Sequence, residues 1–373
     1  MVTDVKRRNN PGANVIGIDW NIGLMDNQLF SNGQIVRSHA DGVLGNAFRF
    51  NLGYKDTKWW SARLWYGQSD TDFEINDLGF LSRNGVSYLG TRLELRQQEP
   101  WNRFINNNVE LKYGQKWNED NLTIERELGF EQWNLLSNYW SVNFFGKLFF
   151  PTFNDNDTFR DENAWVYKTE FWGYAGPRFR TDSRRKIVFE SSFGRGYGKH
   201  RGHGYRTNIK LSIKPVESII LKVDAMEDKS PSHMQWVDLL EKSDDTIRVY
   251  ANSLLLTRDL KFRLDWTFSP KMSFQSFVQP FFAKMNYKEF YRLLAPKTMD
   301  LYPYDYVRDN DDPDFKILNT VGTFVFRWEY RPGSTVFLVY NLSQNRSYSA
   351  PEKQWSSDNS NAVYFKINYW LKN

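Results

Sequence analysis

The segment Ala362-Val-Tyr-Phe-Lys-Ile-Asn-Tyr-Trp-Leu-Lys-Asn373 alternates between apolar and polar residues up to the last position of the chain. Successive side chains of a β-strand point to opposite faces, so one face of this strand would be apolar and the other polar. Lipid-facing and lumen-facing residues alternate in the same way in transmembrane β-barrels. The segment therefore predicts a membrane-spanning strand. Its apolar residues would also serve as the insertion signal of the barrel: Phe365, Ile367, Tyr369 and Leu371.

The same alternation recurs upstream and predicts an all-β chain. About nineteen segments have it, many of them some ten residues long, which is the length that a spanning strand needs. The expected strands are residues 16–24, 29–38, 48–54, 59–68, 86–97, 104–116, 122–133, 139–150, 165–180, 187–197, 205–214, 218–226, 235–241, 246–256, 261–269, 272–284, 317–330, 334–342 and 362–373.

The expected strand count of about 18 to 20 follows from the rule that bacterial single-chain barrels have an even number of strands. Either the weak segment 235–241 is a loop, or a further strand lies upstream of Met1. Tight connections alternate with long ones, and the long ones are expected at residues 69–84, 151–163, 286–315 and 343–361. Since short turns lie on the periplasmic side, the first visible strand would descend, which favours a barrel truncated at its N-terminus.

The composition agrees with a barrel and argues against a helical membrane protein. The 373 residues include 15 Trp, 20 Tyr and 29 Phe, rings that tolerate a boundary between water and lipid. There is no apolar run long enough for a transmembrane helix. The start of the chain has no signal peptide, so residues 1–12 are expected to be a leader or linker before one barrel domain over residues 1–373. The absence of cysteine suits an oxidising export route.

The net charge of +5 is small and its basic residues are dispersed, which argues against nucleic acid as a partner. On a barrel, the basic groups would line the lumen or meet anionic lipid head groups. We therefore expect outer-membrane lipid and lipopolysaccharide as partners, together with the barrel-assembly machinery.

Several segments together resemble one family. They are Phe326-Arg-Trp-Glu-Tyr-Arg-Pro-Gly-Ser-Thr-Val-Phe-Leu-Val-Tyr340, the stretch 263–282, the ending Phe365-Lys-Ile-Asn-Tyr-Trp370, and Gly17-Ile-Asp-Trp20 after Asn10-Pro-Gly-Ala13. The chain resembles the C-terminal domain, of unknown function, of bacterial proteins described as containing a carbohydrate-binding family 9 domain. That domain is taken to be an outer-membrane barrel, and a secreted sandwich domain precedes it. Neither the signal peptide nor the sandwich is present here.

The resemblance implies an outer-membrane location in a Gram-negative bacterium and a function with saccharides or related solutes. The protein would be a channel or a scaffold acting with a carbohydrate-binding domain. The resemblance carries over no catalytic residue and no cofactor. Two alternatives stay open: a hydrolase built into the barrel and acting on lipid, glycan or peptide, and a soluble all-β binding protein. A soluble propeller would show a repeat of about 40 residues, and the sequence has none.

Six charged residues fall on the polar faces of expected strands: Arg49, Arg63, Arg263, Asp265, Arg327 and Glu329. They could line a lumen and select a charged solute, as rings of charge do in pores. They could equally pair with one another and fill the interior, because a lumen of this size must be wet or plugged.

Three further groups could bind metal. Asp155, Asp157 and Asp161 offer oxygen ligands at the spacing of calcium loops, without the glycine and distant glutamate of an EF-hand. His200 and His203 are three residues apart in a cationic loop without a nearby third ligand. In a second acidic loop, tyrosines alternate with aspartates. Carboxylates beside rings could bind a cation or a sugar, or the charges could simply keep an exposed loop soluble. Its residues include Tyr302, Tyr304, Asp305, Tyr306, Asp309, Asp311, Asp312 and Asp314.

Hydrolysis would need a serine, a histidine and an acid brought together. The chain has four histidines and no Gly-x-Ser-x-Gly elbow. The one arrangement that the sequence offers is Ser38, His39 and Asp41 at the end of a strand. Whether the barrel is an enzyme is therefore undecided at this point.

Overall fold

The computed structural model describes residues 2–5, 12–56, 58–76, 79–159, 161, 163–242, 245–307 and 312–371. The chain divides into two compact units, which are described separately. The first unit comprises Met1–Ser137, Asn143–Tyr174 and Pro296–Met299. The second unit comprises Asn138–Val142, Ala175–Ala295 and Asp300–Asn373.

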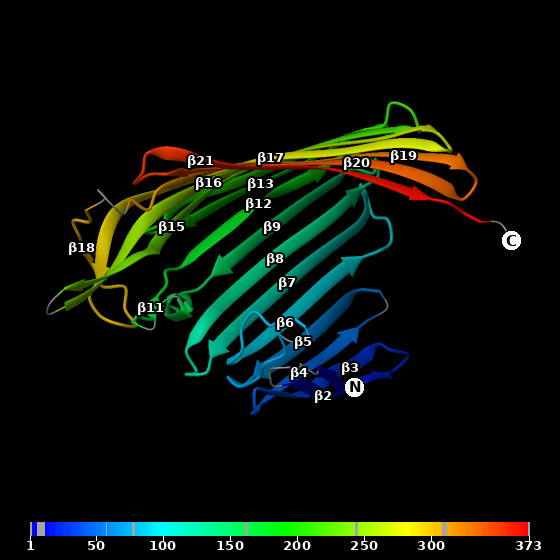
Figure 1. The fold of residues 1–373 in the computed structure, drawn as a ribbon. Coiled ribbons are helices and arrows are strands. Elements are labelled where there is room, and N and C mark those ends of the chain that lie inside the picture. The colour runs from blue at the N-terminus through cyan, green and yellow to red at the C-terminus, as the bar shows by residue number, and fades with distance from the viewer. Residues whose placement is uncertain are drawn as a thin grey trace. The chain divides into compact units, whose positions relative to one another are not determined.

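The first unit is an antiparallel meander in which each strand pairs with the next along the chain (Figure 1). Its strands are β1 (Val2–Val5), β2 (Ala13–Leu24), β3 (Leu29–Ala40), β4 (Val43–Lys55), β5 (Trp60–Ser69), β6 (Val86–Gln97), β7 (Phe104–Asn118) and β8 (Thr123–Leu136). The neighbours β9 (Ser141–Phe149) and β12 (Trp172–Arg180) contribute residues to both units. Between them lie β10 (Phe153–Asn154), the 3-10 helix η1 (Asn156–Phe159) and β11 (Tyr167–Lys168).

The second unit continues the same antiparallel pattern with longer strands (Figure 1). Its strands are β13 (Ile187–Gly198), β14 (Gly202–Ile213), β15 (Ile219–Lys242), β16 (Asp245–Ser269), β17 (Met272–Leu293), β18 (Leu301–Pro303), β19 (Phe315–Arg331), β20 (Ser334–Ser349) and β21 (Gln354–Asn368). In the described part of the chain, 19 strands belong to one sheet. This count lies within the predicted range. No helix of the described residues has the length and apolarity needed to cross a bilayer.

Several predicted boundaries are wrong in the same way, because strands continue through polar stretches. The predicted strands 218–226 and 235–241 are both parts of β15, and 246–256 and 261–269 are both parts of β16. Residues predicted as long loops belong to strands, since β17 continues to Leu293 and only residues 350–353 separate β20 from β21. β21 ends at Asn368, so Tyr369 and Leu371 of the predicted insertion strand follow it.

The segment predicted as a leader or linker contains one short strand. Val2–Val5 forms β1 and pairs with Ala13–Ile16 of β2. Residues 1 and 6–11 lie outside the described part of the chain. The prediction of one domain over the whole chain stays a prediction.

The long connections lie at one end of the strands, as predicted, although other connections at that end, such as 41–42 and 350–353, are short. In the first unit, the turns 25–28, 56–59 and 98–103 are short, while 70–85 and 150–171 at the opposite end are long. In the second unit, 270–271 and 332–333 are short, while 294–314 is long. The two-residue turns 270–271 and 332–333 each contain a proline, and Gly333 has a φ of +79° that favours glycine. We call the two ends the turn end and the loop end.

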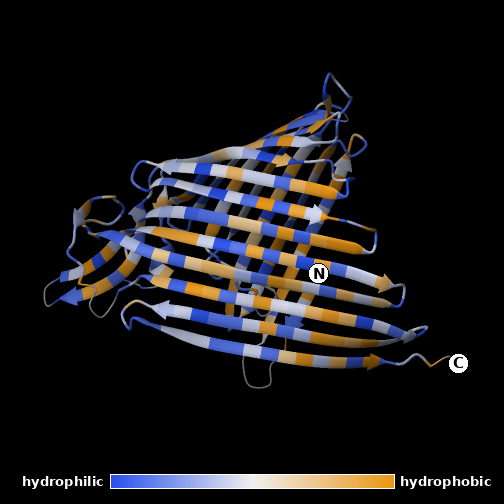
Figure 2. Ribbon diagram, turned by 90° about the horizontal axis from the view of Figure 1, so that it is seen from above, coloured by the Kyte–Doolittle hydropathy of each residue, from blue (hydrophilic) through white to orange (hydrophobic). Residues whose placement is uncertain are grey.

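Hydrogen-bonded register turns the alternation of single strands into continuous rows of apolar side chains, because directly paired residues lie on one face. Hydrophobic and hydrophilic bands alternate along the strands in Figure 2. One row of the first unit is Leu24, Leu29, Tyr54, Ala62, Leu93, Leu111 and Phe130. One row of the second unit is Ile187, Ile213, Leu221, Leu264, Ser276, Phe324, Tyr340 and Val363. We call this side of each unit the apolar face and the opposite side the polar face.

Aromatic side chains lie over glycines on the polar face of the first unit. Phe30 covers Gly53 and Trp65 covers Gly90, so close that a Cβ on either glycine would meet the ring. A bare glycine in a strand loses side-chain packing, and an aromatic partner on the neighbouring strand restores it.

The most completely buried apolar cluster lies in the loop-end extension of the second unit, which we define as residues 229–242, 245–256 and 285–293 of β15, β16 and β17. Val249, Tyr250 and Ala251 are fully buried there, and Met234 and Leu293 are nearly so. Trp236 packs edge to face against Tyr250, with ring centroids 5.4 Å apart. Elsewhere many large apolar residues of the apolar face remain exposed.

Candidate functional site

The polar face of β5 to β8 carries two adjacent rows of charge, which we call the charge ladder. Arg63, Arg92 and Lys112 are directly paired across β5, β6 and β7. The neighbouring row on the same face contains Glu94, Glu110 and Glu131 on β6, β7 and β8. Glu94 and Glu110 are each two residues from the basic residue on their strand, Arg92 and Lys112. The register of the sheet therefore places three basic side chains beside three acidic ones.

Contacts within the charge ladder centre on Glu110, whose side chain is almost fully buried. Its carboxylate pairs with both Arg92 and Lys112. Arg92 also lies 3.5 Å from Glu94, which accepts hydrogen bonds from Ser61 Oγ at 2.9 Å and Asn108 Nδ2 at 2.6 Å. A buried carboxylate costs free energy unless it is paired and hydrogen-bonded, so the ladder holds its acidic groups in place.

The predicted lumen residues all lie on polar faces. Arg63 belongs to the ladder and donates to Asn51 Oδ1 at 2.8 Å, and Arg49 pairs with Gln34 and Gly67 in the same unit. In the second unit, Arg327 lies 3.1 Å from Glu329, and the Arg263 guanidinium lies 5.5 Å from the ring centroid of Phe277. Asp265 is two residues from Arg263 on the same face. The structure thus unites Arg327 with Glu329 and joins Arg63 to residues outside the predicted set.

Four residues of the charge ladder are not among the predicted site residues: Arg92, Glu94, Glu110 and Lys112. Their signal was present, because charged residues recur at every second position in Thr91-Arg-Leu-Glu-Leu-Arg96 and in Glu110-Leu-Lys112. What the sequence could not supply is the register between β6 and β7, which sets the partner of each charge.

A second cluster of polar and aromatic side chains lies in the loop-end extension. His200 stacks on His233 with ring centroids 5.0 Å apart, and His233 Nδ1 lies 2.6 Å from Asn252 Oδ1. Asn252 Nδ2 donates to Glu289 at 2.5 Å, and Tyr291 Oη donates to the same carboxylate at 3.3 Å. Burial and the neighbouring Glu289 raise the pKa of Tyr291, so its hydroxyl stays a hydrogen-bond donor.

Backbone irregularities shape this cluster. The register of β15 against β16 shifts between Ser232 and Gln235, and that of β16 against β17 shifts between Ala251 and Asn252. Met234 and Glu289 have φ values of 61° and 52° at these shifts, which is a strained region for residues other than glycine. The bulges bring His233 and Glu289 to Asn252, an arrangement of amide, imidazole, carboxylate and ring that suits a polar ligand.

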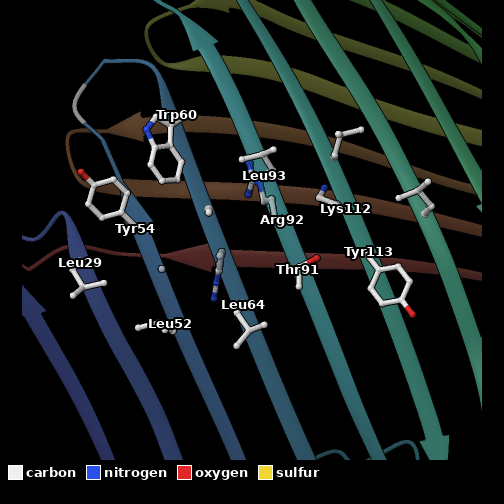
Figure 3. Close-up of a pocket in the computed structure, with 15 residues that line it drawn as sticks. Leu29, Leu52, Tyr54, Trp60, Leu64, Thr91, Arg92, Leu93, Lys112 and Tyr113 are labelled. Atoms are coloured by element: carbon white, nitrogen blue, oxygen red, sulfur yellow. The ribbon is translucent and has the colours of Figure 1, made fainter.

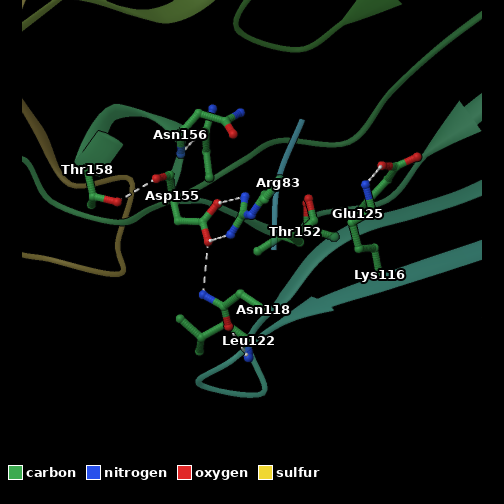
Figure 4. Close-up of polar contacts among 11 residues, drawn as sticks. Arg83, Lys116, Asn118, Leu122, Glu125, Thr152, Asp155, Asn156 and Thr158 are labelled. Carbon is green, nitrogen blue, oxygen red and sulfur yellow. Dashed lines mark hydrogen bonds and ion pairs between the residues drawn. The ribbon is translucent and has the colours of Figure 1, made fainter. Parts of the chain in front are cut away.

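The predicted calcium loop is organised by an arginine. Asp155 is buried and accepts hydrogen bonds from Arg83 at 2.9 and 2.6 Å and from Asn118 at 2.9 Å (Figure 4). Burial alone would raise the pKa of Asp155, but these hydrogen bonds and the Arg83 charge lower it below its usual value. No group of three or more His, Asp or Glu side chains within the described ranges is arranged to hold a metal ion. Asp157 lies buried in η1, and Asp161 donates its backbone N–H to the Asp157 carbonyl.

The remaining predicted constellations separate in the structure. Ser38 and His39 are successive residues of β3 and point to opposite faces, and Ser38 Oγ accepts the Glu74 backbone N–H at 3.0 Å. The side chains of Ser38 and His39 therefore do not lie side by side. His203 packs against Tyr197, while His200 packs against His233. In the second acidic loop, Asp314 binds Asn286 and the Tyr287 backbone, Tyr306 stacks on Phe290, and Asp309 and Asp311 lie outside the described residues.

A shallow groove of about 540 Å³ crosses β3 to β8 in the first unit. Leucine and aromatic side chains from successive strands line it, as Figure 3 shows for Leu52, Tyr54, Leu64 and Leu93. A groove lined in this way fits a hydrocarbon chain better than a polar solute.

Comparison with protein families identifies the family of this chain. The family described as a domain of unknown function, DUF5916, matches residues 1–369. The chain belongs to this family. No curated protein is recognisably similar to this DUF5916 chain in sequence.

Solved structures show the fold of this DUF5916 chain. The siderophore receptor PirA from Acinetobacter baumannii aligns with a TM-score of 0.53 and 7% identity, over 98% of this chain and 72% of that chain. A mutant of the ferric enterobactin receptor PfeA from Pseudomonas aeruginosa aligns with a TM-score of 0.51 and 9% identity, over 98% and 70%. The predicted antiparallel barrel fold of outer-membrane proteins is thereby confirmed, and strand pairing among the described residues leaves the barrel open.

Proposed function

We propose that this DUF5916 chain is the membrane-embedded barrel of a Gram-negative outer-membrane protein, and that its polar face lines a passage for polar solutes. One observation carries the proposal: rows of apolar side chains lie exposed on one face while a charge ladder occupies the other. Leu93, Leu95 and Leu111, on the apolar face of the same strands as the ladder, are 40%, 52% and 43% exposed. Exposed apolar patches of this extent mark a surface that something else covers, and in a barrel that cover is lipid.

The balance of charge on the ladder suggests the kind of solute. Three basic and three acidic side chains lie side by side, so the ladder as a whole has no strong preference for anions or cations. The hydrogen-bonding groups Ser61, Asn51 and Asn108 accompany them. Such a face suits a neutral solute with many hydroxyl groups, which supports passage of saccharides delivered by a carbohydrate-binding domain of the same protein.

The cluster in the loop-end extension would be the first contact for such a solute. His233, Asn252, Glu289 and Tyr291 combine rings with amide and carboxylate groups, and sugars are recognised by rings against their C–H faces and by polar groups at their hydroxyls. The cluster lies at the end of the strands where the long loops are, which is the extracellular end of an outer-membrane barrel. For insertion, β21 would present Phe365 and Ile367 to the barrel-assembly machinery.

The test is export of the chain behind an added signal peptide, followed by membrane fractionation, a heat-modifiability gel and planar-bilayer recording. We expect a heat-modifiable band in the outer membrane and discrete conductance steps. Glu110→Gln should shift ion selectivity towards anions, because Arg92 and Lys112 lose their shared carboxylate. Glu119→Gln, in the turn between β7 and β8, is the matched control and should leave selectivity unchanged.

Two outcomes would contradict the proposal. A chain that stays in the aqueous fraction would rule out the membrane barrel and favour a soluble binding protein. A heat-modifiable barrel without conductance would rule out the passage and favour the scaffold, in which the charge ladder fills the interior.

A further inference from the structure

The apolar face of the second unit changes character near the loop end, where basic residues replace leucines. Lys284 on β17 is directly paired with Lys316 on β19. The same row continues with Tyr348 on β20 and Trp355 on β21. Arg346 lies two residues from Tyr348 on the same face. We call Lys284, Lys316 and Arg346 the basic belt.

The pairing of Lys284 with Lys316 places two like charges directly opposite each other on neighbouring strands. Such side chains are about 5 Å apart at their Cβ atoms, and like charges in this position destabilise a sheet. The arrangement would become favourable if an anion lay between the two amino groups.

The part of the chain that the structure describes does not supply that anion. Among the described residues, no carboxylate forms an ion pair with Lys284, Lys316 or Arg346. The carboxylate of Glu227 is engaged by Arg258 at 2.6 Å and by the Tyr205 hydroxyl at 2.5 Å. Asp314 accepts from Asn286 Nδ2 at 2.9 Å and from the Tyr287 N–H at 2.7 Å.

Aromatic rings hold the basic side chains against the sheet. Lys316 Nζ lies 4.8 Å from the ring centroid of Tyr348, and the Arg346 guanidinium lies 5.3 Å from that of Trp355. Tyr and Trp beside Lys and Arg are typical of the membrane–water interface, where the rings face lipid and the charges face head groups.

The position of the belt agrees with this interface. From Lys284 to Phe274 on the same strand the chain rises about 34 Å, and the tilt of barrel strands reduces that to about 26 Å along the membrane normal. Phe274 belongs to an aromatic row near the turn end, since it pairs with Trp266 and Phe326. The belt and this row therefore bound an apolar band of the height of an outer membrane, about 25 Å.

We propose that Lys284, Lys316 and Arg346 bind a phosphate group of the glycolipid in the outer leaflet of the outer membrane. The inference rests on the proposed membrane barrel and on the loop end being extracellular. The lipid part of lipopolysaccharide carries phosphates at the level of the interface, and its acyl chains would cover the apolar rows below the belt. The phosphate would occupy the space between the paired lysines.

The test compares the double variant Lys284→Gln/Lys316→Gln with Lys222→Gln/Lys366→Gln, which removes the same charge from the polar face. Each protein is purified in mild detergent and titrated with lipid A and with enzymatically dephosphorylated lipid A, with thermal unfolding as the readout. About 1 kcal/mol per basic residue near an anionic surface corresponds to about 30-fold weaker lipid A binding for the belt variant. The polar-face variant should bind lipid A like the wild type.

The outcomes separate this inference from the proposed function. If wild type and both variants are heat-modifiable outer-membrane barrels but bind lipid A equally, the belt has no role and the inference is wrong. Equal stabilisation by dephosphorylated lipid A, or by inorganic phosphate at the same concentration, would also overturn it. Failure of the wild type to enter the outer membrane would instead refute the proposed function.

Discussion

Two regions of the second unit obey the same alternation rule and yet bury their apolar side chains to very different degrees. In the loop-end extension, Val249 and Tyr250 are completely buried by other residues of the protein. On the apolar face nearer the turn end, Tyr340 and Leu338 pack only sideways, as in the stacking of Tyr340 on Phe324 with centroids 5.9 Å apart, and remain substantially exposed.

The difference shows where each region finds its cover. Apolar burial is the main favourable term in folding, and a sheet with an uncovered apolar face gains little of it in water. The extension makes its own core and should be stable in water, whereas the apolar rows need hydrocarbon. The basic belt lies at the boundary between the two regions.

The largest expected effect comes from the same substitution made in both regions. Tyr250→Ala should lower the free energy of unfolding of the extension by about 3–5 kcal/mol, because it leaves a cavity in a dry core. Tyr340→Ala should cost about 1 kcal/mol in detergent, since it loses mainly one aromatic pair. Hydrogen exchange of the two regions measures both values. Equal costs would mean that the apolar face is covered by protein and would break the comparison.

An arginine placed at either of two successive residues of β19 tests which face of the strand contacts lipid, because the two positions lie at nearly the same depth. Phe324→Arg puts the guanidinium among the apolar rows and should destabilise the membrane-inserted state by about 2–4 kcal/mol. Thr323→Arg puts it on the polar face, where it should change stability by less than about 1 kcal/mol. Unfolding by urea from phospholipid vesicles gives both numbers. A larger penalty at Thr323 would reverse the assignment of the faces.

The loop anchored by Asp155 is a third kind of region, held by an ion pair in place of apolar contacts. The pKa of Asp155 is lowered in the folded state, so its contribution to stability is present above the unfolded pKa of about 3.9 and is lost as the pH falls through the folded value. Residues 151–159 should therefore become sensitive to an acid-active protease as the pH falls below about 4.

Asp155→Asn should make the same loop sensitive at pH 7, with a loss of about 2 kcal/mol for the charged hydrogen bonds from Arg83. Asp182→Asn is the control outside this loop: hydrogen bonds from Arg184 lower the pKa of Asp182 to about 2, and its removal should leave loop cleavage unchanged. A loop equally resistant at pH 3 and pH 7 in the wild type would show that Asp155 does not anchor it.

Strand existence was predictable because period-two alternation is strong wherever one face must be apolar, as in residues 262–268. Strand length was not. The stretch Glu227-Asp-Lys-Ser-Pro-Ser232 is typical of a loop, yet β15 runs through it, since Pro231 still pairs opposite Leu254 and Asp228 is held by Arg206 and Ser230. Residues 343–361 likewise lack alternation, and only backbone pairing between β20 and β21 makes them strands.

The candidate sites were predictable only in part. Alternation places Arg63 and Arg327 on polar faces, because facing is a local property of a strand. The pairing of Glu110 with Arg92 and Lys112 depends on register, and the meeting of His233 with Asn252 and Glu289 depends on two bulges. These are properties of several strands together, and single-strand patterns do not contain them.

The most direct test of the central claim is cysteine scanning, which needs no prior substitutions because the chain has no cysteine. Single cysteines at residues 262 to 267 of β16 would be exposed to a membrane-impermeant thiol reagent in intact outer membranes. We predict labelling at Arg263, Asp265 and Thr267 and protection at Phe262, Leu264 and Trp266. Uniform labelling, or protection of the polar positions with labelling of the apolar ones, would contradict it.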